Sequence, residues 1–154
     1  MPRPPLSLRG RALGYLARRE HSRVELEVKL RRSAGPQDDV AALLDEFVAR
    51  GWLSERRLVE QVVNGSQRFG AARVLNDLRR RGIDETLLGP AAQSLKVGEL
   101  PVARAVWNKK FGAAPPADAA ERARQSRFLR SRGFSGSTIA RVLRGGPGPD
   151  EPAE

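Results

Sequence analysis

The feature that most constrains the fold is a helix-ending pattern that occurs three times along the chain. Each copy has a leucine, then arginines and a glycine, and the two clearer copies continue with an apolar residue and a helix-capping residue. The copies lie at residues 129–135 (LRSRGFS), 78–84 (LRRRGID) and, more loosely, 30–36 (LRRSAGP). A glycine after the last helical turn tolerates the left-handed conformation that ends a helix, and Ser or Asp caps the helix that follows.

The spacing of these copies indicates a repeated helical unit. The leucines that open them, Leu30, Leu78 and Leu129, lie 48 and 51 residues apart. A sequence period of about fifty residues is typical of stacked helical repeats. Any helical protein contains such helix ends, so a single copy would carry little information. Three copies with arginines just before the glycine favour a repeat.

The charge of the chain favours a polyanionic partner. Its 154 residues carry 28 Lys and Arg side chains against 18 Asp and Glu, a formal net charge of +10, and nearly all the cations are arginine. The planar guanidinium group of arginine suits phosphate and carboxylate groups. A high arginine content can also follow from background codon usage, so charge alone does not identify the partner.

The residue types that are missing exclude several kinds of site. The chain has no cysteine, which excludes disulfide bonds and cysteine metal sites. No apolar run approaches the ~20 residues of a membrane helix. Residues 1–10 also lack the apolar stretch of a secretory signal. We therefore expect a soluble, cytoplasmic protein with no membrane partner.

Apolar periodicity predicts helices throughout the chain. In residues 40–48 the apolar side chains fall at the i, i+3, i+4, i+7 and i+8 positions of an amphipathic helix. Residues 24–30 are ambiguous, because their alternation of apolar and charged residues is typical of a strand. Ser22 and Glu25 form a capping box, however, and the same apolar residues make two i,i+4 pairs. We favour a helix that packs on two sides.

These patterns predict an all-α fold of roughly nine helices in three groups of three. The groups span residues 9–50, 54–97 and 101–144, with a flexible N-terminus at 1–8 and a disordered tail at 145–154. Pro90 is expected to kink or divide the last helix of the second group, and Pro101 to open the first helix of the third.

The sequence offers no catalytic constellation. His21 is the only histidine, and it has no cysteine or second histidine to share a metal and no evident nucleophile beside it. A capping or packing role is favoured for this side chain. No glycine-rich loop follows a strand, and the GxxxxGK[ST] phosphate-binding pattern is absent. We expect no enzymatic activity, no cofactor and no metal site.

The candidate binding residues are therefore the clustered cations. They are Arg18, Arg19, Arg31, Arg32, Arg56, Arg57, Arg79, Arg80, Arg81, Lys109, Lys110, Arg127, Arg130 and Arg132. Solvated helix surfaces and favourable charge at helix C-termini explain any single cluster equally well. Stacked repeats would align the clusters along one surface, which could hold a phosphate backbone without reading its sequence.

Several segments resemble the RecX family of bacterial recombination regulators. They are residues 15–30 (YLARREHSRVELEVKL), 48–58 (VARGWLSERRL), 73–83 (RVLNDLRRRGI), 103–112 (ARAVWNKKFG) and 127–143 (RFLRSRGFSGSTIARVL). The first and last segments are specific in combination. The middle of the chain departs from the family pattern: Ser54 and Glu55 replace paired aspartates, Leu58 and Val59 replace a Phe-Ala pair, and FGAARV replaces a GP-containing segment.

This resemblance implies an elongated, curved array of three tandem three-helix repeats. It also implies binding to the RecA recombinase filament on single-stranded DNA, in the deep helical groove of that filament. Modulation of the filament is implied too, with inhibition of ATP hydrolysis and strand exchange and promotion of disassembly as the expected direction. We expect a monomer that contacts single-stranded, or also double-stranded, DNA. Two alternatives remain open: a stand-alone nucleic-acid-binding protein, suggested by the charge alone, and a helical adaptor for another acidic protein.

Overall fold

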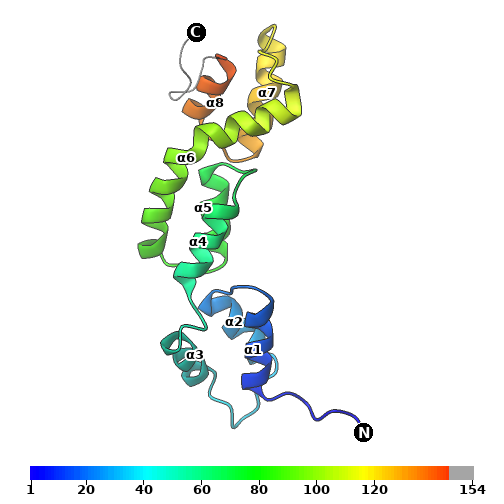
Figure 1. The fold of residues 1–154 in the computed structure, drawn as a ribbon, viewed down its shortest axis with the longest axis vertical. Coiled ribbons are helices and arrows are strands. Elements are labelled where there is room, and N and C mark those ends of the chain that lie inside the picture. The colour runs from blue at the N-terminus through cyan, green and yellow to red at the C-terminus, as the bar shows by residue number, and fades with distance from the viewer. Residues whose placement is uncertain (146–154) are drawn as a thin grey trace.

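The computed structural model describes residues 1–145, which form eight α-helices and no strand. The helices are α1 (Leu8–Arg18), α2 (Arg23–Arg31), α3 (Val40–Ala49), α4 (Glu55–Gly65), α5 (Ala71–Arg80), α6 (Glu85–Phe111), α7 (Ala119–Ser131) and α8 (Gly136–Leu143). Figure 1 shows an elongated, curved array, with α1 to α3 at one end and α7 and α8 at the other. The all-α repeat fold expected from the sequence is confirmed.

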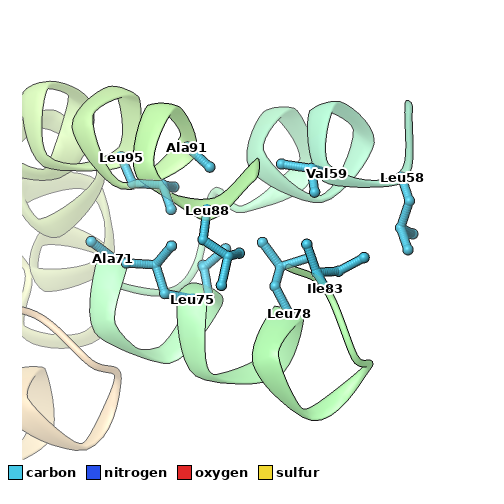
Figure 2. Packing of buried hydrophobic residues seen from close by; sticks show 10 residues of the cluster. Leu58, Val59, Ala71, Leu75, Leu78, Ile83, Leu88, Ala91 and Leu95 are labelled. Atoms are coloured by element: carbon cyan, nitrogen blue, oxygen red, sulfur yellow. The ribbon is translucent and has the colours of Figure 1, made fainter. Parts of the chain in front are cut away.

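Three separate hydrophobic clusters form the core of the array. One lies among α1, α2 and α3 (unit 1), and one among α4, α5 and the first half of α6 (unit 2). The third lies among the second half of α6, α7 and α8 (unit 3). In unit 2, Leu78 of α5 and Leu88 of α6 are at most 1% exposed and lie on facing sides of the cluster (Figure 2). Each unit therefore buries its own apolar stripes.

The expected break between units 2 and 3 is absent, because α6 runs unbroken over 27 residues. The sequence predicts nine helices, whereas the described residues contain eight. Pro90 and Pro101 both lie inside α6, and each removes one backbone N–H from the helix. The apolar side chains of its two halves are buried in two different clusters. This packing outweighs the local cost of the prolines, so one rod connects the two units.

The ambiguous segment is helical, as expected, but α2 packs on one side only. The Ser22 hydroxyl accepts a hydrogen bond from the Glu25 N–H, as the capping box predicts. Leu26 and Leu30 are fully buried, whereas the two valines of the segment are half exposed. Because α1 and α3 both pack against the leucine side, the expectation of a helix buried on two sides is wrong.

The two ends of the chain lie outside this packing. Residues 1–7 form no helix and are exposed, and α1 begins at Leu8, the last residue of the segment expected to be flexible. The tail expected at 145–154 lies outside the described residues, except for Gly145.

The units are joined end to end through their middle helices, α2, α5 and α7. At the junction of units 2 and 3, the end of α7 meets the start of α5, where the Gly70 N–H donates to the Arg132 carbonyl at 2.8 Å. A Cβ atom at Gly70 would lie 2.2 Å from the carbonyl oxygen of Gly133. The two backbones can approach this closely only because neither residue has a side chain.

The junction of units 1 and 2 repeats this arrangement with other side chains. The Ser22 hydroxyl, at the start of α2, donates to the Arg81 carbonyl at the end of α5. A Cβ atom at Gly82 would lie 2.9 Å from the Cβ of Val24. Gly82 and Gly133 both have positive φ, at 83° and 88°. The two clearer copies of the leucine–arginine–glycine pattern therefore mark a helix end that docks on the middle helix of the preceding unit, whereas Gly35 of the looser copy lacks a positive φ and meets only Asp38.

Glu99 of α6 fastens units 2 and 3 through the N-termini of two helices. Its Oε1 accepts from the N–H of Ala71, at the start of α5, and from the N–H of Ser135, which caps α8, at 3.3 and 3.2 Å. Its Oε2 accepts from the hydroxyls of Ser135 and Thr138 at 3.0 and 2.8 Å. The positive ends of both helix dipoles favour a carboxylate at this buried position.

Replacing Glu99 with glutamine is expected to lower the free energy of unfolding by about 2 kcal/mol. The two carboxylate oxygens of Glu99 accept four hydrogen bonds, whereas the glutamine amide has only one acceptor oxygen. The NH2 group of the amide would also face donors that it cannot accept from. Urea unfolding followed by circular dichroism measures the change. The matched control is Glu60→Gln on α4, where the side chain is 65% exposed and 3.8 Å from Arg56. That substitution should cost less than about 0.5 kcal/mol, and equal losses in the two variants would contradict the role of Glu99.

A candidate nucleic-acid interface

Six of the predicted binding cations are engaged in ion pairs with acidic side chains of the same chain. They are Arg19, Arg31, Arg56, Arg57, Arg79 and Arg81. The exposed pairs among them add little stability, but all six pairs neutralise charge. These six side chains are therefore less available to an external anion than the sequence suggests.

Two of these pairs hold the junction of units 1 and 2. Arg57 of α4 pairs with Glu20, and the Nε of Arg81 lies 2.5 Å from an oxygen of Glu25. Burial raises the pKa of Glu25, but hydrogen bonds from Arg81 and Arg19 outweigh burial and hold that pKa below its usual value. Arg57 and Arg81 thus fasten the array together, a role that the sequence pattern does not predict.

The other eight predicted cations make no ion pair with any described residue, and most of them lie in unit 3. They are Arg18, Arg32, Arg80, Lys109, Lys110, Arg127, Arg130 and Arg132. Residues 101–145 hold ten Lys and Arg side chains against two acidic ones, whereas residues 1–100 hold 18 against 13. The positive charge of the protein is therefore concentrated in unit 3.

Cations from both sides of the junction between units 2 and 3 surround one open hollow of about 320 Å³, here called the basic hollow. Its lining residues are Arg68, Val106, Lys109, Lys110, Phe128 and Arg132. These side chains come from the loop before α5, the end of α6 and the end of α7. Four of the six are cationic, and among the described residues no acidic side chain contributes to the lining. The basic hollow is thus suited to an anion.

A row of cations and aromatic rings, here called the cation–aromatic ladder, crosses the same junction. The guanidinium carbon of Arg73 lies 4.0 Å from the ring centre of Phe69, and that of Arg132 lies 5.6 Å from the same centre. Arg132 also lies 5.2 Å from the ring centre of Phe128, which has the Nζ of Lys110 at 5.6 Å. Each contact contributes about 0.5–1 kcal/mol at an exposed site. The rings therefore restrain cations that have no acidic partner.

A second hollow of about 450 Å³ lies against the ends of α5 and α7. Its lining residues are Ala72, Arg73, Asn76, Asp77, Arg80, Arg130, Ser131 and Gly133. It brings the predicted residues Arg80 and Arg130 together with Arg73. Because Arg73 also belongs to the ladder, the ladder connects this hollow with the basic hollow.

The residues of this surface that sequence reasoning missed include three near the start of α5: Arg68, Phe69 and Arg73. None belongs to a run of cations, and the surrounding FGAARV segment departs from the family pattern. The available signal is position, because Arg68 and Phe69 directly precede the glycine at which a middle helix begins. Conversely, Arg18, Arg32 and Arg127 were predicted as contacts but line neither of the two hollows.

His21 is a packing residue at the start of α2. Its ring is buried, with Nδ1 3.0 Å from the Arg19 carbonyl oxygen and Nε2 2.8 Å from the Nζ of Lys29. Burial lowers the pKa of His21, which favours the neutral ring. A neutral ring that donates from Nδ1 and accepts from Lys29 at Nε2 satisfies both contacts.

Two other kinds of site find no support within residues 1–145. No group of three or more His, Asp or Glu side chains there is arranged to hold a metal ion. No helix in that range combines the length and apolar character needed to cross a membrane.

Family models and related sequences match this chain over most of its length. Residues 99–143 match the family model described as RecX, third three-helix domain, and residues 9–47 match RecX, first three-helix domain. The regulatory protein RecX of Ralstonia nicotianae is 47% identical over 146 residues, covering 94% of this chain and 91% of the relative. That of Leptothrix cholodnii is 50% identical over 143 residues, covering 92% and 90%. That of Pseudomonas syringae pv. tomato is 40% identical over 148 residues, covering 95% and 96%.

Two solved structures share the fold. The crystal structure of RecX from Lactobacillus salivarius matches with a TM-score of 0.75 at 17% identity, covering 89% of this chain and 92% of that one. A crystal structure of regulatory protein RecX matches with a TM-score of 0.74 at 18% identity, covering 89% and 71%. At these identities the likeness concerns the fold alone.

Proposed function

The chain belongs to the RecX family of regulatory proteins, and on this premise we propose that it binds the RecA recombinase filament on single-stranded DNA. It acts there as a regulator rather than an enzyme, and it lowers the ATPase and strand-exchange activity and the stability of the filament. This role places it in the cytoplasm, as a monomer, with the recombinase and DNA as its partners.

The observation that carries this proposal is the concentration of cations without ion pairs around the junction of units 2 and 3. A filament of recombinase on DNA is a polyanionic helical assembly, and it offers both acidic protein surfaces and phosphates. The basic hollow and the ladder gather cations from three helices without acidic side chains to neutralise them. Unit 1, in contrast, has most of its arginines paired within the chain.

The shape of the array supports the same function. Units joined end to end form a long molecule with little breadth (Figure 1), which suits it to lie along a helical groove and contact several recombinase protomers. A bound regulator that bridges adjacent protomers would hinder the movements that accompany ATP hydrolysis and strand exchange. Inhibition then requires no catalytic group in the regulator.

The direct test is a titration of the DNA-dependent ATPase of the cognate recombinase with the purified protein. We expect the ATPase rate on single-stranded DNA to fall as the protein is added at amounts comparable to the recombinase. Strand exchange should fall over the same range. Unchanged ATPase and strand exchange at equimolar protein would contradict the proposal.

A second candidate function is stand-alone nucleic-acid binding, which the charge of unit 3 favours. Gel-shift titrations of single- and double-stranded DNA at several salt concentrations separate the two functions. Tight binding without recombinase, together with no effect on filaments, would favour the second. Weak DNA binding that falls steeply with salt, together with an effect on filaments, favours the first.

A further inference from the structure

We propose that the cation–aromatic ladder, with the basic hollow beside it, binds the phosphodiester backbone of single-stranded nucleic acid without reading its bases. This inference rests on the proposed function, and it assigns to this one surface the contact with the DNA strand.

The cations of the ladder would be stabilised by an external polyanion. Arg132 contacts the rings of both Phe69 and Phe128, and each ring has a second cation over it, Arg73 on Phe69 and Lys110 on Phe128. Like charges held this close repel one another, and no acidic side chain of the described residues lines the basic hollow. Arg19, Arg31 and Arg81, in contrast, each have a carboxylate partner within the chain. Bound phosphates would supply the missing counter-charge.

The geometry indicates a phosphate contact rather than base stacking. Base-stacking platforms need an exposed aromatic face, and here cations lie over the rings of Phe69 and Phe128. Both rings are also partly buried against the hydrophobic clusters of units 2 and 3. They fix the guanidinium groups in place, and arginines fixed in this way contact phosphates of any base sequence.

The arrangement of the cations favours a flexible strand over an acidic protein surface. Arg73 lines the second hollow and contacts the ring of Phe69, which Arg132 of the basic hollow also contacts. The second hollow has three arginines, Arg73, Arg80 and Arg130, against one acidic residue, Asp77. A single strand carries one charge per nucleotide and can follow such a path from hollow to hollow. A folded acidic surface would have to match the shape of both hollows at once.

The test compares two triple variants with equal loss of charge. The first variant, here called the ladder variant, is Arg68→Gln, Lys109→Gln, Lys110→Gln. It removes three of the four cations of the basic hollow, and one of these, Lys110, also belongs to the ladder. The control variant is Arg122→Gln, Arg141→Gln, Arg144→Gln. All six side chains are exposed, and none has an ion pair within residues 1–145. The control residues line neither of the two hollows. Binding to fluorescein-labelled 20-nucleotide poly(dT), poly(dC) and a mixed-sequence duplex is measured by fluorescence anisotropy from 50 to 200 mM salt.

We expect the ladder variant to bind both single strands at least tenfold more weakly than the wild type. Its plot of log K against log salt should be less steep by about 2, because three phosphate contacts each contribute ~0.7 on a single strand. The control variant should change less than threefold, and the wild type should bind poly(dT) and poly(dC) alike. Arg68→Gln alone, in a loop outside the helices, should weaken binding at least twofold.

Equal losses in the ladder and control variants would overturn the inference in favour of diffuse charge. So would a ladder variant that loses binding to the duplex only. If the ladder variant keeps its affinity for DNA but no longer binds recombinase in a DNA-free pull-down, the site belongs to an acidic protein surface and the inference fails. The proposed function is tested by a different measurement: it is contradicted if the wild-type protein leaves the recombinase ATPase unchanged.

Discussion

Replacing Gly70 with alanine is expected to lower the free energy of unfolding by about 3 kcal/mol or more. The added Cβ would lie 2.2 Å from the Gly133 carbonyl oxygen and 2.4 Å from the Phe134 nitrogen. Both are backbone atoms at the end of α7, so no side-chain rotation can relieve the overlap. The hydrogen bond from the Gly70 N–H to the Arg132 carbonyl would be lost as the two helix ends separate. Thermal and urea unfolding, followed by circular dichroism, measure the loss.

Gly14→Ala is the matched control for this substitution. Gly14 lies inside α1, and a Cβ there would meet nothing within 4 Å. Alanine in a helix interior is favoured over glycine by about 0.5–1 kcal/mol, so this variant should gain stability. A Gly70→Ala protein as stable as the wild type would show that units 2 and 3 are not joined through this contact.

Replacing Leu78 with alanine should lower the free energy of unfolding by about 2–5 kcal/mol. Leu78 is fully buried in the cluster of unit 2, and it lies opposite Leu88 of α6 (Figure 2). The rigid ends of α5 and α6 would leave part of the vacated volume unfilled. The melting temperature should fall by roughly 2–4 °C for each kcal/mol in a chain of this length. Calorimetry or circular dichroism measures the shift.

Val97→Ala on α6 provides the comparison, because Val97 is 75% exposed. The Val97→Ala substitution should change the free energy of unfolding by no more than about 0.5 kcal/mol. A loss below 1 kcal/mol for Leu78→Ala, or losses of similar size in the two variants, would contradict the packing described for unit 2.

Local signals in the sequence predicted most of the helices correctly. Ser22, Asp39, Ser54, Asp84, Asp118 and Ser135 each accept a hydrogen bond from a backbone N–H of the helix that they precede. The pattern glycines Gly82 and Gly133 have the positive φ that ends a helix. Capping and helix termination depend on residues within one turn of each other, which is why the sequence reveals them.

The unbroken course of α6 could not be read from the sequence in the same way. Pro90 and Pro101 act locally as helix breakers, and only packing against two separate clusters makes the continuous helix the more stable outcome. That packing depends on residues up to about forty positions away, for which the local pattern carries no signal.

The sequence predicted only part of the candidate site, because it shows where cations cluster but not which of them form ion pairs in the folded chain. Clusters of Lys and Arg identified Arg80, Lys109, Lys110, Arg130 and Arg132, which do lie at the two hollows. The sequence did not indicate that Arg57 and Arg81 would pair with Glu20 and Glu25, which are 37 and 56 residues away. Pairing across a junction depends on how whole units dock. The sequence therefore does not distinguish arginines that form ion pairs within the chain from arginines that are available to a binding partner.

The repeated pattern has a meaning beyond ending helices. In its two clearer copies the glycine lies where one unit meets the preceding one, Gly82 against Val24 at the first junction and Gly133 against Arg73 at the second. The same pattern thus sets the length of the helices and the contact between units. At the second junction it also places Arg132 between two aromatic rings. The fold and the proposed interface therefore share the residues around Gly133.

The most direct measurement is the ATPase of the cognate recombinase on single-stranded DNA, titrated in parallel with the wild type, the ladder variant and the equally charged control variant. We expect the wild type and the control variant to inhibit at amounts comparable to the recombinase. The ladder variant should require at least tenfold more protein. An ATPase rate that stays constant as wild-type protein is added would contradict the proposal that this chain regulates the filament.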